Sequence, residues 1–190
     1  MASVRRQSVD ERRRLIIEVA RKHAEAGGWA SVTTRLLADA IGYTQPVLYG
    51  HFPGGKADIM SAVALEGFAD LAGNLRAAIG DRIGRATVVG AAEAYLDFAA
   101  TWPAVYEVMF SLPIGATFGQ PDSDNELREG FTALAAAING VGGEPETTTE
   151  VFWAGLHGLA ALDRSGRLRP EFRSARIEEL ATRFSYAEKT

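Results

Sequence analysis

Polar, aromatic and basic side chains gather between residues 33 and 56, where the sequence reads TTRLLADAIGYTQPVLYGHFPGGK. Gln45 carries an amide that can form a bidentate pair with the edge of an adenine base. Tyr49, His51 and Lys56 follow it and carry groups that can contact phosphate oxygens. The combination is typical of nucleic-acid recognition, in which phosphate contacts set the register and base contacts read the sequence.

No other set of residues points as clearly to a chemistry. His23, His51 and His157 are not at metal-ligand spacing, and the sequence has no serine-hydrolase elbow, phosphate-binding loop or zinc-protease motif. Cys is absent, which excludes disulfides, thiolate metal sites and cysteine nucleophiles. We therefore expect no enzyme activity, no metal and no cofactor.

The charge distribution favours the same segment. The whole chain has a net charge of -4. Residues 1–56 nevertheless hold nine Lys or Arg and five Asp or Glu, a balance of +4, and the remainder has a balance of -8. A basic N-terminal part on an acidic body is expected when only the N-terminal part of a protein binds the phosphate backbone of a nucleic acid. A chance excess of charge on a solvated helix face is the alternative.

Local signals predict the helices that lead into this segment. Ser8 and Glu11 have the spacing of a capping box, and Gly27-Gly28 should end the helix that they begin. Thr33 is a good N-cap for a second helix. Gly42 can take the positive φ that a tight turn between helices requires.

A third helix should carry the groups listed first. Thr44 is its predicted N-cap, with the hydroxyl accepting from the amide of Val47, and Pro46 fits its first turn. Val47 and Leu48 are expected in the core. Phe52 should end this helix, because a residue that precedes a proline resists the α region.

Helical periodicity continues to the C-terminus, and no segment alternates with strand period, so we predict an all-α fold of about nine helices. A helix–turn–helix head over residues 1–55 and a helical body over 56–190 are expected. In the body, one long helix is predicted to begin at Lys56. Further helices are predicted over 86–101, 104–111, 125–139, 146–165 and 171–187, with a loop over 114–125. No apolar run is long enough to span a membrane and no secretory signal is evident, which indicates a cytoplasmic protein.

The stretch GYTQPVLYGHFPGGK resembles the head of the TetR (tetracycline repressor) family of transcription regulators, and the resemblance covers about residues 12–60. The order Trp153, His157, Gly158 also resembles a subgroup marked by Trp-x-x-x-His-Gly. The family implies a homodimer that binds double-stranded operator DNA and responds to a small-molecule effector. Its DNA-binding positions correspond here to Thr33, Thr34, Tyr43, Thr44, Gln45, Pro46, Tyr49, His51 and Lys56.

Two glycines depart from the family pattern. Gly50 replaces a large polar or basic residue, and Gly55 replaces the hydroxyl N-cap of the fourth helix, so a looser helix end and a weaker joint are expected. Packing for Tyr49 and helix capping for His51 remain alternatives to phosphate contact.

Residues 151–162 are apolar on almost every side, which predicts a helix that packs on its own core and on a partner. The family places dimerisation on the last two helices. The corresponding residues are Ala154, Gly158, Ala161, Ile177, Leu180 and Phe184. Packing of both stripes inside one chain is the alternative.

Large apolar and aromatic side chains concentrate in the middle of the body and predict a cavity for an apolar or aromatic ligand. They are Phe68, Leu71, Phe98, Trp102, Tyr106, Met109, Phe110, Phe131 and Trp153, with His157 as a hydrogen-bonding group. His157 could equally be a satisfied interface histidine. The resulting expectation is a ligand-responsive regulator, most often a repressor in this family. A helical ligand-binding protein without operator recognition is the alternative.

Overall fold

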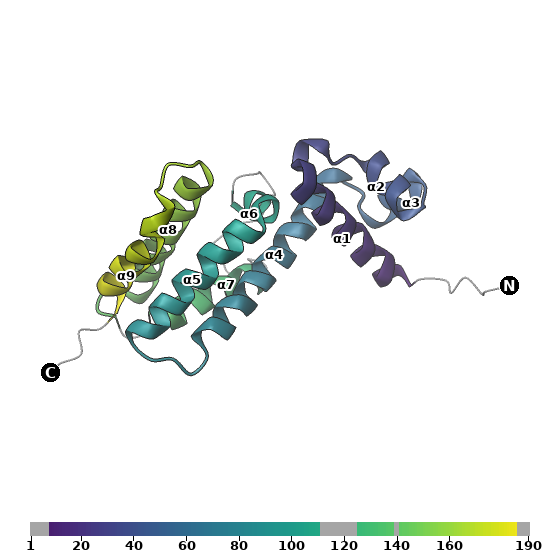
Figure 1. Ribbon diagram of the computed structural model, residues 1–190. Coiled ribbons are helices and arrows are strands. Elements are labelled where there is room, and N and C mark those ends of the chain that lie inside the picture. The colour runs from purple at the N-terminus through teal and green to yellow at the C-terminus, as the bar shows by residue number, and fades with distance from the viewer. Residues whose placement is uncertain (1–7, 111–124, 139–140, 186–190) are drawn as a thin grey trace. The chain divides into compact units, whose positions relative to one another are not determined.

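The computed structural model describes residues 8–110, 125–138 and 141–185. These residues form nine α-helices and two short 3-10 turns, without strands among them, which confirms the all-α prediction. The helices are α1 (Val9–Gly27), α2 (Thr34–Ile41), α3 (Gln45–His51), α4 (Lys56–Ile79), α5 (Arg85–Thr101), α6 (Pro103–Phe110), α7 (Asn125–Ala137), α8 (Pro145–Arg164) and α9 (Arg173–Phe184). Figure 1 labels each of them.

Most predicted boundaries are confirmed within one or two residues. The last helix differs, because a 3-10 turn, Pro170–Phe172, precedes it and α9 begins only at Arg173. The predicted loop over 114–125 lies almost entirely outside the described residues. The last helix ends at Phe184, three residues before its predicted end.

The described residues fall into two compact units. The first contains the residues up to Gly67 together with those from Ala104 to Phe110. The second contains Phe68–Pro103 and the described residues from Asn125 onward. The division into domains at residues 55 and 56 remains a prediction.

In the first unit, α1, α2 and α3 pack on one another around a small core. Ile16, Ile17, Leu37, Leu48 and Phe52 are each at most 1% exposed and fill that core. The capping box is present at the start of α1, where Ser8 Oγ accepts from the Glu11 amide at 3.1 Å and Glu11 accepts from the Ser8 amide at 2.7 Å.

In the second unit, α5 packs against α7, α8 and α9, and α8 and α9 lie side by side (Figure 1). Tyr95, Phe152 and Leu156 are fully buried there. Glu144 caps α8, and hydrogen bonds from the Thr147 and Glu146 amides lower the pKa of its carboxyl.

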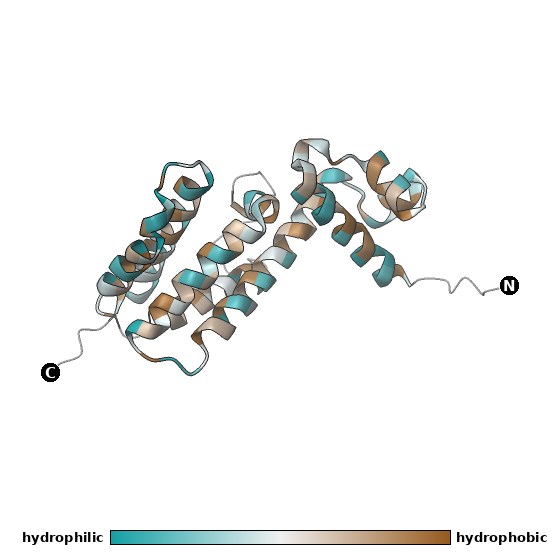
Figure 2. Ribbon diagram, in the orientation of Figure 1, coloured by the Kyte–Doolittle hydropathy of each residue, from teal (hydrophilic) through white to brown (hydrophobic). Residues whose placement is uncertain are grey.

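Figure 2 shows hydrophilic residues interspersed with hydrophobic ones along the helices. Accordingly, none of the helices in the described ranges has the length and apolar character that crossing a membrane requires.

Candidate functional site

The turn between α2 and α3 has the geometry that its sequence predicts. Thr33 Oγ1 accepts from the Leu36 amide at 3.1 Å and caps α2. Gly42 adopts a left-handed conformation with φ 71°, which a residue with a side chain rarely adopts. Its amide donates to the Asp39 carbonyl at 3.3 Å, and the Tyr43 amide donates to the Ala38 carbonyl at 3.0 Å. These bonds end α2 and turn the chain into α3.

Thr44 is the N-cap of α3, as predicted, but its hydroxyl makes no capping hydrogen bond. The Val47 and Leu48 amides donate instead to the Thr44 carbonyl, at 3.0 and 3.3 Å. Pro46 has no amide hydrogen that would need an acceptor in the first turn, so these two backbone bonds are enough to begin the helix. The prediction of a side-chain cap was wrong. The Thr44 hydroxyl therefore keeps its hydrogen-bonding capacity for another partner.

One side of α3 is exposed. Thr44, Gln45, Pro46 and Tyr49 are exposed, whereas Leu48 is fully buried. Val47 was expected in the core and is 37% exposed, so that prediction was wrong. The physical reason is helical spacing.

Leu48 and Phe52 are four residues apart, and together they occupy the face of α3 that points into the core. Val47 precedes Leu48 by one residue, about 100° away around the helix, so it lies off that face.

The junction between α3 and α4 holds two of the predicted phosphate contacts. Lys56 is half-buried, and its Nζ donates to the Trp29 carbonyl at 2.5 Å. Gly55 has φ 63°, and a Cβ there would lie 3.1 Å from Tyr49 Cε1. Gly55 thus permits both the left-handed turn and the approach of the Tyr49 ring. The family resemblance had indicated only that this glycine lacks the usual hydroxyl N-cap.

Asp58 ties this junction together, since its Oδ2 accepts from the Gly54 amide at 2.6 Å. The roles of Tyr49, His51 and Lys56 at DNA stay predictions, as do those of Thr33, Thr34, Tyr43, Thr44, Gln45 and Pro46.

Sequence reasoning missed a hydrogen-bonded latch on α6, made by Glu25 of α1 and by Trp29 of the 3-10 turn Trp29–Ser31 that follows α1. The two carboxylate oxygens of Glu25 accept from the amides of Ala104 and Val105 at 3.1 and 3.0 Å. Trp29 is 4% exposed, and its Nε1 donates to the Ala104 carbonyl at 2.7 Å. Glu25 therefore supplies the acceptors that the first turn of α6 lacks.

Only one signal of this latch is visible in the sequence. Pro103 marks the start of a helix whose first amides need acceptors, but nothing in the pattern singles out a carboxylate 79 residues earlier.

The ten residues predicted to line a ligand cavity are distributed over both units. Tyr106 and Met109 are 1% exposed in the first unit, where the rings of Tyr106 and Phe110 have centroids 4.7 Å apart. In the second unit, Phe68, Leu71 and Phe98 are buried, Phe131, Trp153 and His157 are half-buried, and Trp102 is 38% exposed. Because the ten residues belong to two different units, one cavity lined by all of them stays a prediction.

Two polar groups of this set are positioned within the second unit. Trp153 Nε1 donates to the Tyr95 hydroxyl at 3.1 Å. Burial lowers the pKa of His157, and the Arg164 cation lowers it further, so the imidazole is neutral at neutral pH.

The predicted dimer residues divide by helix. On α8, Ala154 and Ala161 are exposed and Gly158 is half-buried, so burial all round this helix is not observed within the described chain. Val151 and Leu162, which are 55% and 40% exposed, extend the same apolar stripe. On α9, Ile177 is buried, and Leu180 and Phe184 are half-buried, with the Phe184 ring centroid 5.1 Å from that of Phe152.

Within the described residues, no cluster of three His, Asp or Glu side chains could hold a metal ion.

Two stretches of the chain match family models. Residues 16–63, which contain the whole α2–turn–α3 segment, match the model for "Bacterial regulatory proteins, tetR family". Residues 88–184 match the model for "Tetracyclin repressor-like, C-terminal domain". The two matches lie at opposite ends of the chain, in the order that a DNA-binding head and a C-terminal body require.

Individual proteins agree with these models. An uncharacterized HTH-type transcriptional regulator of Mycobacterium tuberculosis is 27% identical over 157 residues, which are 81% of this chain and 71% of that protein. A protein with unknown function from Rhodococcus sp. RHA1 has a similar structure, with a TM-score of 0.72, 20% identity and coverage of 96% of this chain and 94% of that one. The multidrug binding protein EbrR, solved with imidazole, has a TM-score of 0.65 at 22% identity, with coverage of 95% and 93%. These two structures show the shared fold.

Proposed function

Since this chain belongs to the tetR family of bacterial regulatory proteins, it is a ligand-binding, DNA-binding regulator of transcription, and we propose that it acts as a repressor. Its partner in this proposal is a palindromic double-stranded operator, from which a small apolar or aromatic molecule releases it. The observation that carries the proposal is the exposed side of α3. Gln45, Pro46 and Tyr49 are exposed on a helix whose other side is held in the core by Leu48 and Phe52.

Gln45 is the proposed base-reading residue, and Tyr49 and Lys56 are proposed to hold the DNA backbone. Gln45→Ala should therefore reduce discrimination at one base pair, by about 1–3 kcal/mol. Tyr49→Phe removes only a hydroxyl and should weaken binding to all sequences alike. The measurement is fluorescence anisotropy on a panel of operators mutated one base pair at a time.

A uniform loss of affinity in Gln45→Ala over that panel would contradict the base-reading role. Lys56→Ala needs a thermal unfolding control, because Lys56 also donates to the Trp29 carbonyl.

Dimerisation is proposed through the apolar stripe on α8. Gly158 is half-buried, and an added Cβ meets nothing within 4 Å in the described chain, so the Cβ of a leucine there begins in open space. At an interface between two α8 helices the same change should cost about 1–3 kcal/mol per site. We expect sedimentation to show folded monomers or a weakened dimer.

Gly73→Leu is the matched control, because Gly73 is an exposed helical glycine in α4 at which an added Cβ likewise meets nothing within 4 Å. A Gly158→Leu protein that remains as tight a dimer as Gly73→Leu would move the interface away from this stripe.

The ligand is proposed to bind among the aromatic residues of the body, including Trp102. Support comes from the concentration of these side chains and from the resemblance to a fold that a multidrug binding protein also adopts. A ligand shifts the equilibrium only by its different affinities for the two states, so operator DNA must weaken ligand binding by the same factor. Trp102→Ala should keep operator binding and lose the ligand response. Equal ligand affinities with and without operator would rule out the coupling.

The competing function is a helical ligand-binding protein without operator recognition. It predicts ligand binding with no operator affinity above that for random DNA. The proposal also includes a cytoplasmic location, no catalytic activity and membership of the Trp-x-x-x-His-Gly subgroup, for which Trp153, His157 and Gly158 are the support.

A further inference from the structure

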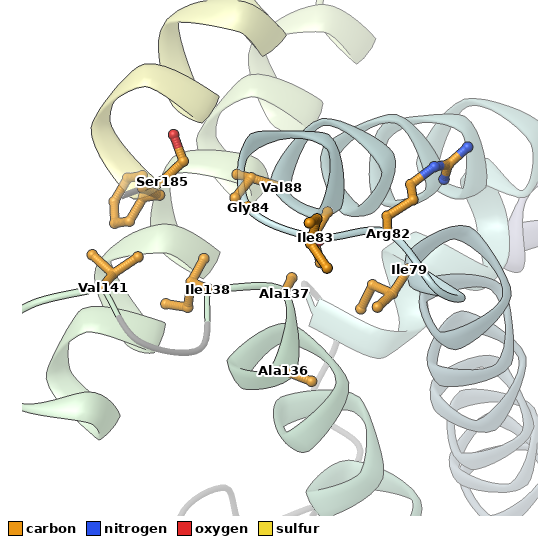
Figure 3. Close-up of a pocket in the computed structure, with 12 residues that line it drawn as sticks. Ile79, Arg82, Ile83, Gly84, Val88, Ala136, Ala137, Ile138, Val141 and Ser185 are labelled. Atoms are coloured by element: carbon orange, nitrogen blue, oxygen red, sulfur yellow. The ribbon is translucent and has the colours of Figure 1, made fainter. Parts of the chain in front are cut away.

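A pocket lies within the second unit, and Phe184 is the one aromatic residue among those that line it. It is formed by the end of α4, the first turns of α5, the end of α7 and the last turn of α9 (Figure 3). Its walls are mainly aliphatic and include Ile79, Ile83, Val88, Ala137, Ile138 and Val141. Its volume is about 230 Å³. None of its lining residues belongs to the ten predicted for the effector.

Thr87 adds one polar group to this apolar wall. The residue lines the pocket and is only 6% exposed. Its amide donates to the Gly84 carbonyl at 3.1 Å, but its hydroxyl has no hydrogen bond within the described ranges. This hydroxyl is not sealed from solvent, so a ligand that bonds to it exchanges a hydrogen bond to water for one inside the pocket.

The one charged residue among those lining the pocket is turned away from it. Arg82 Nη1 donates to the Ala78 carbonyl, and Gly90 leaves room for the guanidinium, because a Cβ there would lie 2.5 Å from Nη1. Figure 3 shows the guanidinium pointing away from the other labelled side chains. The pocket therefore offers aliphatic surface and the hydroxyls of Thr87 and Ser185, but no charge to pair with an ionised ligand. The Ser185 hydroxyl already donates to the Ala181 carbonyl, which leaves the Thr87 hydroxyl for a ligand.

We propose that this pocket binds a small neutral molecule of about one ring, with a single hydrogen-bonding group directed at Thr87. The size follows from volume: a dry apolar cavity of about 150 Å³ holds benzene, whereas drug-sized ligands need about 300 Å³ or more. A substituted single ring lies between these limits. This site is independent of the proposed transcriptional function.

The test uses p-cresol and toluene as probes, which differ by one hydroxyl group. Each is titrated into the full-length protein carrying ¹³C-labelled isoleucine methyl groups. Saturable shifts are expected at Ile79, Ile83 and Ile138, and not at Ile16 or Ile17 in the core of the first unit. Thr87→Val has nearly the same shape without the hydroxyl. It should lower p-cresol affinity about three- to tenfold and leave toluene affinity unchanged.

A second substitution fills the space itself. Ala137→Leu should abolish the shifts for both probes, and Ala136→Leu, at an exposed lining position, should do the same if the buried variant does not fold. Three results overturn the proposal. They are the absence of saturable shifts at the three isoleucines, unchanged p-cresol affinity in Thr87→Val, and full binding in a folded variant that fills the pocket.

Discussion

Gly67→Ala is expected to lower the free energy of unfolding by about 1–3 kcal/mol, although alanine favours a helix more than glycine does. Gly67 lies in α4 and is buried against α6. A Cβ there would lie 2.6 Å from Val105 Cγ1 and 2.7 Å from Met109 Sδ. Met109 can move its flexible end, but the β-branched Val105 has little rotamer freedom in a helix. The added methyl group should therefore push α6 away from α4.

Gly73→Ala provides the matched comparison on the same helix. Gly73 is exposed, and a Cβ there has nothing within 4 Å, so only helix propensity changes. This variant should gain up to about 1 kcal/mol. Chemical denaturation of both proteins gives the two free energies. If Gly67→Ala is as stable as Gly73→Ala, the close approach of α4 and α6 is wrong.

Glu25→Ala has the second large expected effect, because it removes both acceptors at the start of α6. Hydrogen bonds to a charged group are each worth about 1.5–3 kcal/mol, and partial exposure reduces this, so a total loss of about 1–3 kcal/mol is expected. The Ala104 and Val105 amides would be left to water. Urea denaturation is the measurement.

Glu18→Ala is its control, since Glu18 lies on the same helix, is exposed and has no hydrogen bond or ion pair recorded within the described residues. It should change stability by less than about 0.5 kcal/mol. Equal effects of the two substitutions would show that the latch contributes nothing. Trp29→Phe, which keeps the ring but loses Nε1, should give an intermediate loss.

The latch also has a consequence for regulation. Glu25 and Trp29 fix α6 to the first helix of the unit that carries α3. A ligand that displaces α6 would therefore act directly on the packing of α1. We expect Glu25→Ala to retain ligand binding but to weaken the effect of ligand on operator affinity.

Local interactions were the predictable part of this molecule. The caps at Ser8 and Thr33 and the turn at Gly42 depend on residues three or four positions apart, so the sequence is enough to find them. The same holds for most helix limits, which follow from Pro, Gly and the spacing of apolar residues.

What could not be predicted depends on contacts between distant segments. The Glu25 latch joins residues 79 positions apart, and the bond from Lys56 to Trp29 joins the first residue of α4 to the 3-10 turn after α1. Val47 was misplaced because pattern alone does not say which of two adjacent apolar residues points into the core of a seven-residue helix. The pocket beside Thr87 collects residues from four helices, none of which has an unusual sequence.

DNase I footprinting on the promoter region of the protein's own gene shows whether the protein binds an operator as a dimer. Each chain has one short exposed recognition helix, which is too small to read an operator alone. A homodimer on a palindromic operator should give a symmetric protected region with two half-sites about one helical turn apart or slightly more. Protection of a single asymmetric half-site by a monomer, or no protection above that on random DNA, would contradict this prediction.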